Sequence, residues 1–474
     1  MRGGVLFLAC LGLSIAVQAQ TAQELPQAPT PNSAVLTLPS GVAVDRATPE
    51  ALPLSLNDAI ERGLQYNLQV RLSRENERRV HGLALTVNNN LLPNMSVQAS
   101  TSTQMINLAA MGFKPSALAG LAIPGLNLGN FEFKPIVKVD STAAQLNLEQ
   151  QLFNVPAYHL YRAAQKAANV AAYTTRDVDQ AVMLAVGTQY LRTVADAAQI
   201  GNARALAAAD QVAFEQARAL HAAGVGTNLD ELRARVQLQT QQQELINTEN
   251  VFAKDKIALN RMIGLPAEQQ LTLTDKAPYE EYVEMPIEEA RALAYAHRND
   301  LLSLQSQQDV ADRTLRATRA ERFPSLAFRG FYGVSGETHG LYHGVFAASG
   351  RLSFPIFNEG QLRGERQVAQ AQATGLRQQI ESLRVTIEQQ IRSSMLDVES
   401  SKQLVTVARS NVDLATQALQ DATDRFQAGV SDNLPVVTAQ ATLAGAQSQM
   451  VEALYLYNQS KLALARSTGV FATK

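Results

Sequence analysis

Apolar residues recur at helical spacing along a large part of this chain. Between Gln361 and Ala428 they fall mostly at steps of three, four or seven residues, with Gln, Arg, Ser and Glu in the remaining positions. This pattern predicts a helix that packs along one face and is exposed to water on the other. About seventy residues at ~1.5 Å per residue would span roughly 100 Å, far more than a globular domain. The stripe consists of Leu376, Ile380, Leu383, Ile387, Ile391, Met395, Val398, Val405, Val412 and Leu419.

A second long helix is expected from about Pro156 to Ala222, and both long helices stop just before a glycine. Gly224 and Gly429 occupy these positions, where glycine readily adopts the left-handed conformation that ends a helix. Asp230 and Asp432 follow at positions where an acidic side chain caps the start of a returning helix. The pattern therefore predicts two antiparallel helical hairpins.

Four other segments alternate between apolar and polar residues, as strands do. Alternation over about ten residues fits a tilted membrane-spanning strand better than a globular strand, which averages five or six. Charged residues on the polar side suit a water-filled lumen, and the residues assigned to that lumen are Gln98, Glu149, Arg329 and Arg351. The alternative is a small antiparallel sheet on a soluble helical protein. The strands are expected at about 95–104, 142–153, 325–334 and 346–355.

Four strands are too few to close a membrane-spanning barrel. An open sheet edge in lipid would leave backbone groups unpaired, at a cost of several kcal/mol each. Closure therefore requires identical copies, and because an eight-stranded barrel is filled by its own side chains, an open channel favours three copies or more.

The chain contains the same plan twice. Leu54 and Met285 begin similar phrases, and Leu92 and Phe323, each followed by proline, are separated by the same number of residues as that first pair. Such constant spacing indicates tandem duplication of a unit of roughly 200 residues. The expected organisation is a first repeat at 54–270, a linker at 271–285 and a second repeat at 286–471. The first helix of copy one is expected from about Ser55 to Leu91.

Composition and targeting narrow the class of protein. Tryptophan is absent, aromatic residues make up 6% of the chain and the net charge is -2, which fits long helices and gives no sign of nucleic-acid binding. Residues 1–19 resemble a secretory signal with cleavage after Ala19, and a Pro-rich leader follows at 20–53. The only cysteine, Cys10, lies within the signal; its acylation is a weaker alternative. We find no motif typical of an enzyme, a cofactor site or a metal site.

The arrangement resembles the outer-membrane efflux protein family typified by TolC. The resemblance runs from Leu54 to about Phe471 and depends on several short phrases taken in order and in duplicate. These are Leu56 to Ala59, Leu92-Pro93, Phe354 to Gly360, Arg425 to Leu434 and Thr438 to Gln440.

The resemblance implies a mainly α fold with transmembrane β: a homotrimer whose twelve strands form one β-barrel in the outer membrane, above a long α-helical barrel in the periplasm. Its implied function is the exit duct of a tripartite efflux pump or type I secretion system. The implied partners are outer-membrane lipid, a periplasmic adaptor and an inner-membrane pump of the RND, ABC or MFS type. Adaptor docking would involve the two turns, at Gly224, Val225, Gly226, Gly429, Val430 and Ser431.

The periplasmic mouth departs from the family pattern. Well-known members carry acidic residues on the returning helix of copy two, whereas the matching positions here are Pro435 and Thr438. Asp230 and Asp432 remain candidate gate residues, although both also suit helix capping.

Two further questions stay open from sequence alone. Arg329 and Arg351 either bias the lumen toward anions or belong to a solvated wall paired with Glu149. The whole chain is either an export duct or a periplasmic coiled-coil adaptor or scaffold without a pore.

Overall fold

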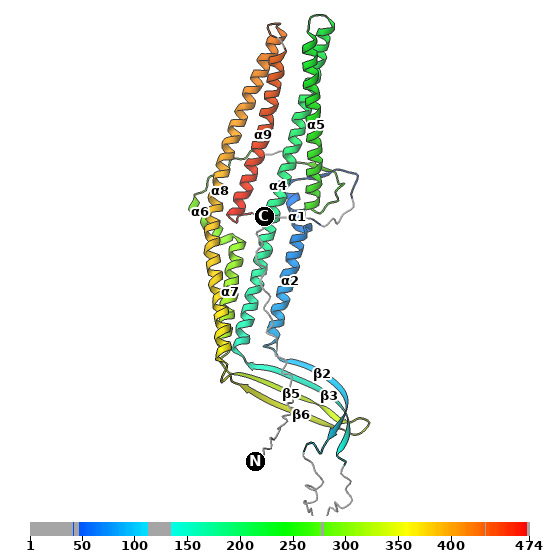
Figure 1. Ribbon diagram of the computed structural model, residues 1–474, viewed down its shortest axis with the longest axis vertical. Helices are drawn as coiled ribbons and strands as arrows, with labels where there is room; N and C mark the ends of the chain where they lie inside the picture. Colours follow the sequence, from blue (N-terminus) through cyan, green and yellow to red (C-terminus); the bar gives the residue numbers. More distant parts are fainter. Residues whose placement is uncertain (1–40, 42–46, 112–133, 276–278, 432, 472–474) are drawn as a thin grey trace, which may run out of the picture.

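The computed structural model describes residues 41, 47–111, 134–275, 279–431 and 433–471. The molecule is elongated, with a sheet at one end and two helical hairpins at the other (Figure 1). Among the residues described, no helix is both long and apolar enough to cross a membrane.

The sheet contains the four expected strands. They are β2 (Asn94–Asn107), β3 (Ile136–Phe153), β5 (Ser325–Glu337) and β6 (Tyr342–Ser353). All neighbours are antiparallel, in the order β2-β3-β5-β6. The strands are longer than the predicted ranges, and only the predicted end of β6 extends past the observed one. The loop between β2 and β3 lies largely outside the described residues.

Each copy begins with two short helices, whereas we expected a single helix at the start of copy one. The prediction of one helix from Ser55 to Leu91 is wrong: α1 (Leu56–Tyr66) and α2 (Leu68–Asn89) are separated at Asn67. Asn67 has extended backbone angles, and its side-chain oxygen accepts a hydrogen bond from the Gln69 N–H at 2.9 Å. This buried asparagine therefore caps α2 and breaks the helix. Copy two has the same break between α6 (Ile287–His297) and α7 (Asn299–Ala320).

The long helices agree with the sequence pattern. They are α4 (Val155–Ala222), returning as α5 (Asn228–Met262), and α8 (Glu359–Gln427), returning as α9 (Leu434–Ser467). The predicted stripe of α8 is confirmed, because Ile380, Ile387, Ile391, Val398 and Val405 are buried.

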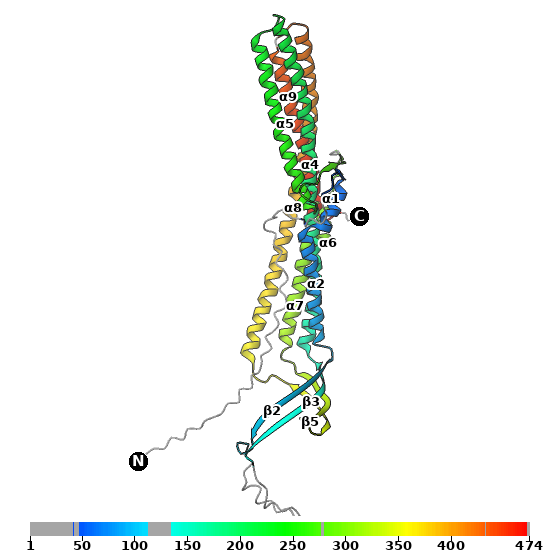
Figure 2. The same cartoon turned by 90° about the vertical axis from the view of Figure 1, so that its right-hand side faces the viewer.

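The helices form a layer in which each contacts the next. Near the sheet the order is α2-α4-α7-α8, and toward the far end it is α5-α4-α9-α8. Figures 1 and 2 show α4 running the length of this layer.

A small belt packs against the middle of the layer. Strand β1 (Leu52–Leu54) pairs in parallel with β4 (Leu271–Leu273). Leu54 belongs to a core with Val182, Val186 and Leu259. The end of the expected leader and the start of the expected linker are thus structured, because their alternate apolar residues are buried or half-buried in this core.

Candidate functional site

Strand register brings the four residues assigned to a lumen onto one face of the sheet. Gln98 pairs with Gln145, four residues before Glu149 on β3. Glu149 pairs with Arg329, which is opposite Ser349 on β6, two residues before Arg351. Because side chains alternate between faces along a strand, all four project from the same side.

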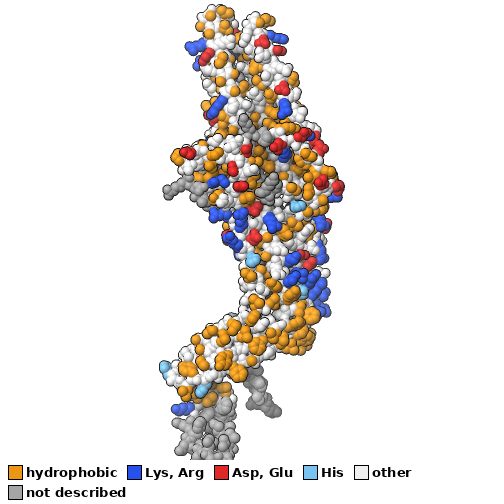
Figure 3. All heavy atoms as spheres, turned by 180° about the vertical axis from the view of Figure 1, so that it is seen from behind, with side chains coloured by type: hydrophobic (Ala, Val, Ile, Leu, Met, Phe, Trp, Pro, Cys, Tyr) orange, Lys and Arg blue, Asp and Glu red, His pale blue; other side chains and the backbone are white. Residues whose placement is uncertain are grey.

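The opposite face of the sheet is uncovered and mainly apolar toward the helices, and the Lys138–Asp140 ion pair lies at its far end. Val97 is 79% exposed, Tyr332 70% and Phe346 78%. Leu146 and Leu148 pair with residues of this same face. Figure 3 shows hydrophobic side chains gathered over the sheet and its junction with the helices, and Lys and Arg side chains on the helices beyond. The sheet thus has one polar and one mainly apolar face, both open in the single chain.

The two arginines of the polar face differ in their surroundings. Arg329 Nε donates a hydrogen bond to Glu149 Oε1 at 2.6 Å. Arg351 is exposed and is opposite Ala327 on the neighbouring strand. Within the described part of the chain, Arg351 has no hydrogen bond or ion pair. The sequence left open whether these arginines pair with Glu149 or act as free charges in the lumen. In the structure Arg329 pairs with Glu149, and Arg351 keeps a free charge.

Both glycine turns have the predicted geometry. Gly224 and Gly429 have φ angles of 71° and 72°. The N–H of Val225 donates to Leu220 O at 3.0 Å, and the N–H of Val430 donates to Arg425 O at 3.0 Å. These bonds close the same helix-terminating motif in each copy. It leaves Val225 79% exposed and Val430 78% exposed at the tips.

The remaining turn residues differ between the two copies. Gly226 approaches its own helix closely, since an added Cβ would lie 3.0 Å from Leu220 Cβ. The Gly226 N–H also donates to Leu220 O at 2.9 Å. Ser431 is half-buried, and its hydroxyl has no hydrogen-bond partner among the residues described.

The candidate gate residues that the structure describes, Asp230, Pro435 and Thr438, lie near the starts of the returning helices. The Asp230 N–H donates to Thr227 Oγ1 at 3.1 Å, and Thr227 Oγ1 donates back to the Asp230 carboxylate at 2.5 Å. Asp230 therefore takes part in a helix cap. Pro435 lies in the first turn of α9, and the Thr438 hydroxyl donates to Leu434 O at 2.9 Å. Asp432 lies outside the described residues.

Sequence reasoning missed a histidine–glutamate contact at the tip of copy one. His221 Nδ1 lies 2.5 Å from Glu231 Oε2, across the turn between α4 and α5. The corresponding residues of copy two are Phe426 and Val436, which pack in an apolar cluster. The sequence could have revealed this contact, because a position-by-position comparison of the two duplicated turns shows polar residues in copy one where copy two has apolar residues. The two tips therefore have different chemistry.

Sequence reasoning also missed a charged cluster that joins the hairpins. Arg192 on α4 lies 3.5 Å from Asp196, 3.9 Å from Asp255 on α5 and 3.8 Å from Glu452 on α9. Its guanidinium also lies 5.6 Å from the centre of the Tyr455 ring. No sequence pattern pointed to this cluster, because its members come from three helices.

Within this cluster, Asp196 is nearly enclosed. It is 5% exposed, and burial together with a hydrogen bond from the protonated Asp196 carboxyl to the Asp255 carboxylate raises the pKa of Asp196 to about 7. Arg192 opposes that rise only in part. One turn further along α4, Gln199 exchanges two hydrogen bonds with Ser448 of α9, at 3.1 and 3.0 Å.

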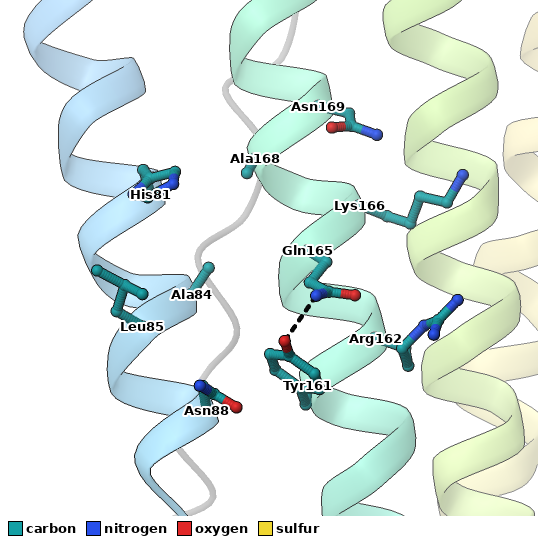
Figure 4. A pocket seen from close by; sticks show the side chains of 10 residues that line it. All are labelled: His81, Ala84, Leu85, Asn88, Tyr161, Arg162, Gln165, Lys166, Ala168 and Asn169. Carbon is teal, nitrogen blue, oxygen red and sulfur yellow. Dashed lines mark hydrogen bonds between the residues drawn. The ribbon is translucent and has the colours of Figure 1, made fainter.

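A groove of about 450 Å³ runs between α2 and α4 near the sheet. Figure 4 shows the lining residues, among them Ala84 on α2, which points toward α4, and Tyr161 and Gln165 on α4. The Gln165 amide donates to the Tyr161 hydroxyl at 2.7 Å. The groove is open to solvent, and both polar and apolar side chains line it. In the part of the chain that the structure describes, no three His, Cys, Asp or Glu side chains converge in a way that would hold a metal ion.

The family model described as "Outer membrane efflux protein" matches residues 87–265 and 290–470. The alkaline protease secretion protein AprF of Pseudomonas aeruginosa is 26% identical over 340 residues, 69% of each chain. The toluene efflux pump outer membrane protein TtgF of Pseudomonas putida is 27% identical over 319 residues, 65% of each chain. The Campylobacter jejuni CmeC outer membrane channel superimposes with a TM-score of 0.73 at 14% identity, covering 87% of this chain and 85% of that one.

Proposed function

Because the chain belongs to the outer membrane efflux protein family, we propose that three copies of it assemble into one duct leading from the periplasm to the exterior. The protein is an outer-membrane channel and not an enzyme. Relatives named for protease secretion and for toluene efflux support two kinds of cargo route, a type I secretion system and a tripartite efflux pump.

The main support for assembly is that both edges of the sheet are open. Strands β2 and β6 each have a partner on one side only, and the apolar face between them is uncovered. In lipid each unpaired backbone group would cost several kcal/mol. Pairing β6 of one copy with β2 of the next removes both edges, and continues the antiparallel order without interruption.

The number of copies follows from the width of the pore. Two copies would give eight strands, and a barrel of that size is filled by side chains. Three copies give twelve strands and leave room for solute. The helical layer supports the same arrangement, because α2 and α8 are the outermost helices of its sheet-proximal half in contact order.

The two faces of the sheet then have distinct roles. Val97, Tyr332 and Phe346 face lipid, and the face that carries Gln98, Glu149, Arg329 and Arg351 lines the lumen. Lipid would cover the exposed apolar side chains and so remove their unfavourable contact with water.

The helical tips are the docking site that we propose for a periplasmic adaptor, which connects the duct to an inner-membrane pump of the RND, ABC or MFS type. The exposed Val225 and Val430 give each tip an apolar contact, and Gly224, Gly226, Gly429 and Ser431 shape the turns around them. The mouth would lack an acidic ring at Pro435 and Thr438, and Asp230 and Asp432 stay the acidic candidates for the gate.

Reconstitution tests this function directly. The processed full-length protein, extracted from outer membranes in detergent and added to planar lipid bilayers, should produce discrete steps of conductance. A deletion strain tested against antibiotics, metals and secreted proteins should then show which cargo accumulates. Release of the protein as a soluble monomer by osmotic shock, with no conductance, would instead support a periplasmic adaptor or scaffold.

A further inference from the structure

The polar face of the sheet carries its charges in two groups. At the helix-proximal end lie Glu149, Arg329 and Arg351, and at the distal end lies Glu337, opposite Ser141. Glu337 and Ala327, the partner of Arg351, are ten residues apart on β5, so roughly 33 Å separates these two levels along the strand. The helix-proximal group therefore acts on an ion separately from Glu337.

Within the helix-proximal group, one positive charge is left over. Arg329 and Glu149 neutralise each other at 2.6 Å. Arg351 has the uncharged Ser349 and Ser353 as its nearest neighbours on the same face of β6, and Ala327 opposite.

A neighbouring copy cannot neutralise Arg351 through the adjacent strand. In a closed ring the strand next to β6 is β2 of the following copy. Strand β2 has the sequence NMSVQASTSTQMIN, which contains no charged residue. No register between β6 and β2 can therefore place a carboxylate of that strand beside Arg351.

We propose that Arg351 is a charge-selectivity residue of the duct, and that three copies of it form a positive ring which favours anionic over cationic cargo. The ring lies at the level where solute passes from the helical tunnel into the barrel. This inference rests on the proposed trimeric duct, and it assigns a chemical class, small anions, to the preferred cargo. A ring of fixed charges sets ion preference through its field on the permeating ion.

The test is the reversal potential of single channels in a tenfold KCl gradient. Arg351→Gln should lower the chloride-to-potassium permeability ratio by about two- to fivefold, with the larger effect at low salt, where screening is weaker. Arg351→Lys should keep the wild-type ratio. The matched control is the double variant Glu149→Gln/Arg329→Gln, which removes a neutral pair and should leave the ratio unchanged.

A second measurement avoids any effect on assembly. Arg351→Cys introduces a thiol into a chain whose only natural cysteine lies in the predicted signal. Modification of the inserted channel by a cationic methanethiosulfonate should raise the anion preference, and an anionic reagent should lower it. Channels whose reversal potential is the same for wild type, Arg351→Gln and both modified forms would overturn the inference. Failure of the wild type to form channels would instead refute the proposed function.

Discussion

Arg192 on α4 lies 3.8 Å from Glu452 on α9, and this ion pair joins the two helical hairpins of one chain. Arg192 also approaches Asp196 and Asp255, so a single cation serves three carboxylates on three helices. Among the described residues of the two hairpins, the last side-chain hydrogen bonds between α4 and α9 toward the tips are those of Gln199 with Ser448.

We expect Arg192→Met to loosen the connection between the hairpins. The substitution leaves three carboxylates without their cation and removes the contact with the Tyr455 ring, which together should cost about 1 kcal/mol, because Arg192 and Glu452 are partly solvated. Hydrogen exchange along α9 from Leu434 to Glu452 measures the effect. Arg204→Met is the control: its pair with Glu249 lies within one hairpin at 2.7 Å, and α9 should exchange as in wild type.

Asp196 should make the helical domain less stable as the pH rises. The folded pKa of about 7 exceeds the unfolded value of about 3.9. The folded state therefore holds the proton more tightly, and stability falls between about pH 4 and pH 7. The cost at pH 8 is on the order of 2–4 kcal/mol for the isolated group.

Asp196→Asn tests this linkage. The variant should melt at a higher temperature than wild type at pH 8, and both should melt alike near pH 4, as followed by circular dichroism at 222 nm in detergent. Glu249→Gln, on an exposed pair of the neighbouring helix, keeps Asp196 and should therefore lose stability with rising pH as the wild type does. Equal melting of Asp196→Asn and wild type at pH 8 would contradict the assignment.

Replacing the turn glycines should impair export more than assembly. Gly224 and Gly429 have positive φ angles, and an added Cβ would meet no atom within 4 Å. Gly224→Val or Gly429→Val should therefore cost about 1–2 kcal/mol through backbone strain alone, confined to the tip. Gly201→Val, inside α4 with equally open surroundings, is the control. Loss of the trimer with intact export would refute the placement of these turns.

Replacing two glycines of the sheet with alanine should have different effects on assembly. A Cβ on Gly333 of β5 would lie 2.2 Å from Ala144 O, whereas a Cβ on Gly344 of β6 would meet nothing within 4 Å in the chain. Gly333→Ala must therefore displace β3, and it should reduce the amount of heat-resistant oligomer on gels. Gly344→Ala should assemble normally. Similar assembly of the two variants would mean that the β3–β5 contact can relax.

Local patterns were enough to predict much of this fold. The stripe from Leu376 to Leu419, the glycine turns and the alternating strands each depend on residues close together in sequence, so the pattern and the structure agree. Alternation also assigned each side chain to a face of its strand, and the observed register places Gln98 and Arg351 on the same face.

Tertiary features escaped prediction for identifiable reasons. The break at Asn67 interrupts a pattern that otherwise continues through it, and its cause is burial against α5, where the Asn67 amide lies 3.5 Å from Met262 O. The Arg192 cluster depends on which turn of α4 faces α5 and α9, a relationship that no spacing within α4 encodes. The pairing of β1 with β4 joins three-residue segments too short to show alternation.

The most direct test of the account is the mass of the assembled protein. Light scattering coupled to size-exclusion chromatography, with the detergent contribution subtracted, should give three times the mass of the processed polypeptide. The account predicts that this species inserts into bilayers and conducts. A particle containing one polypeptide, stable without detergent, would contradict it, because the edges of β2 and β6 would then need no neighbouring copy.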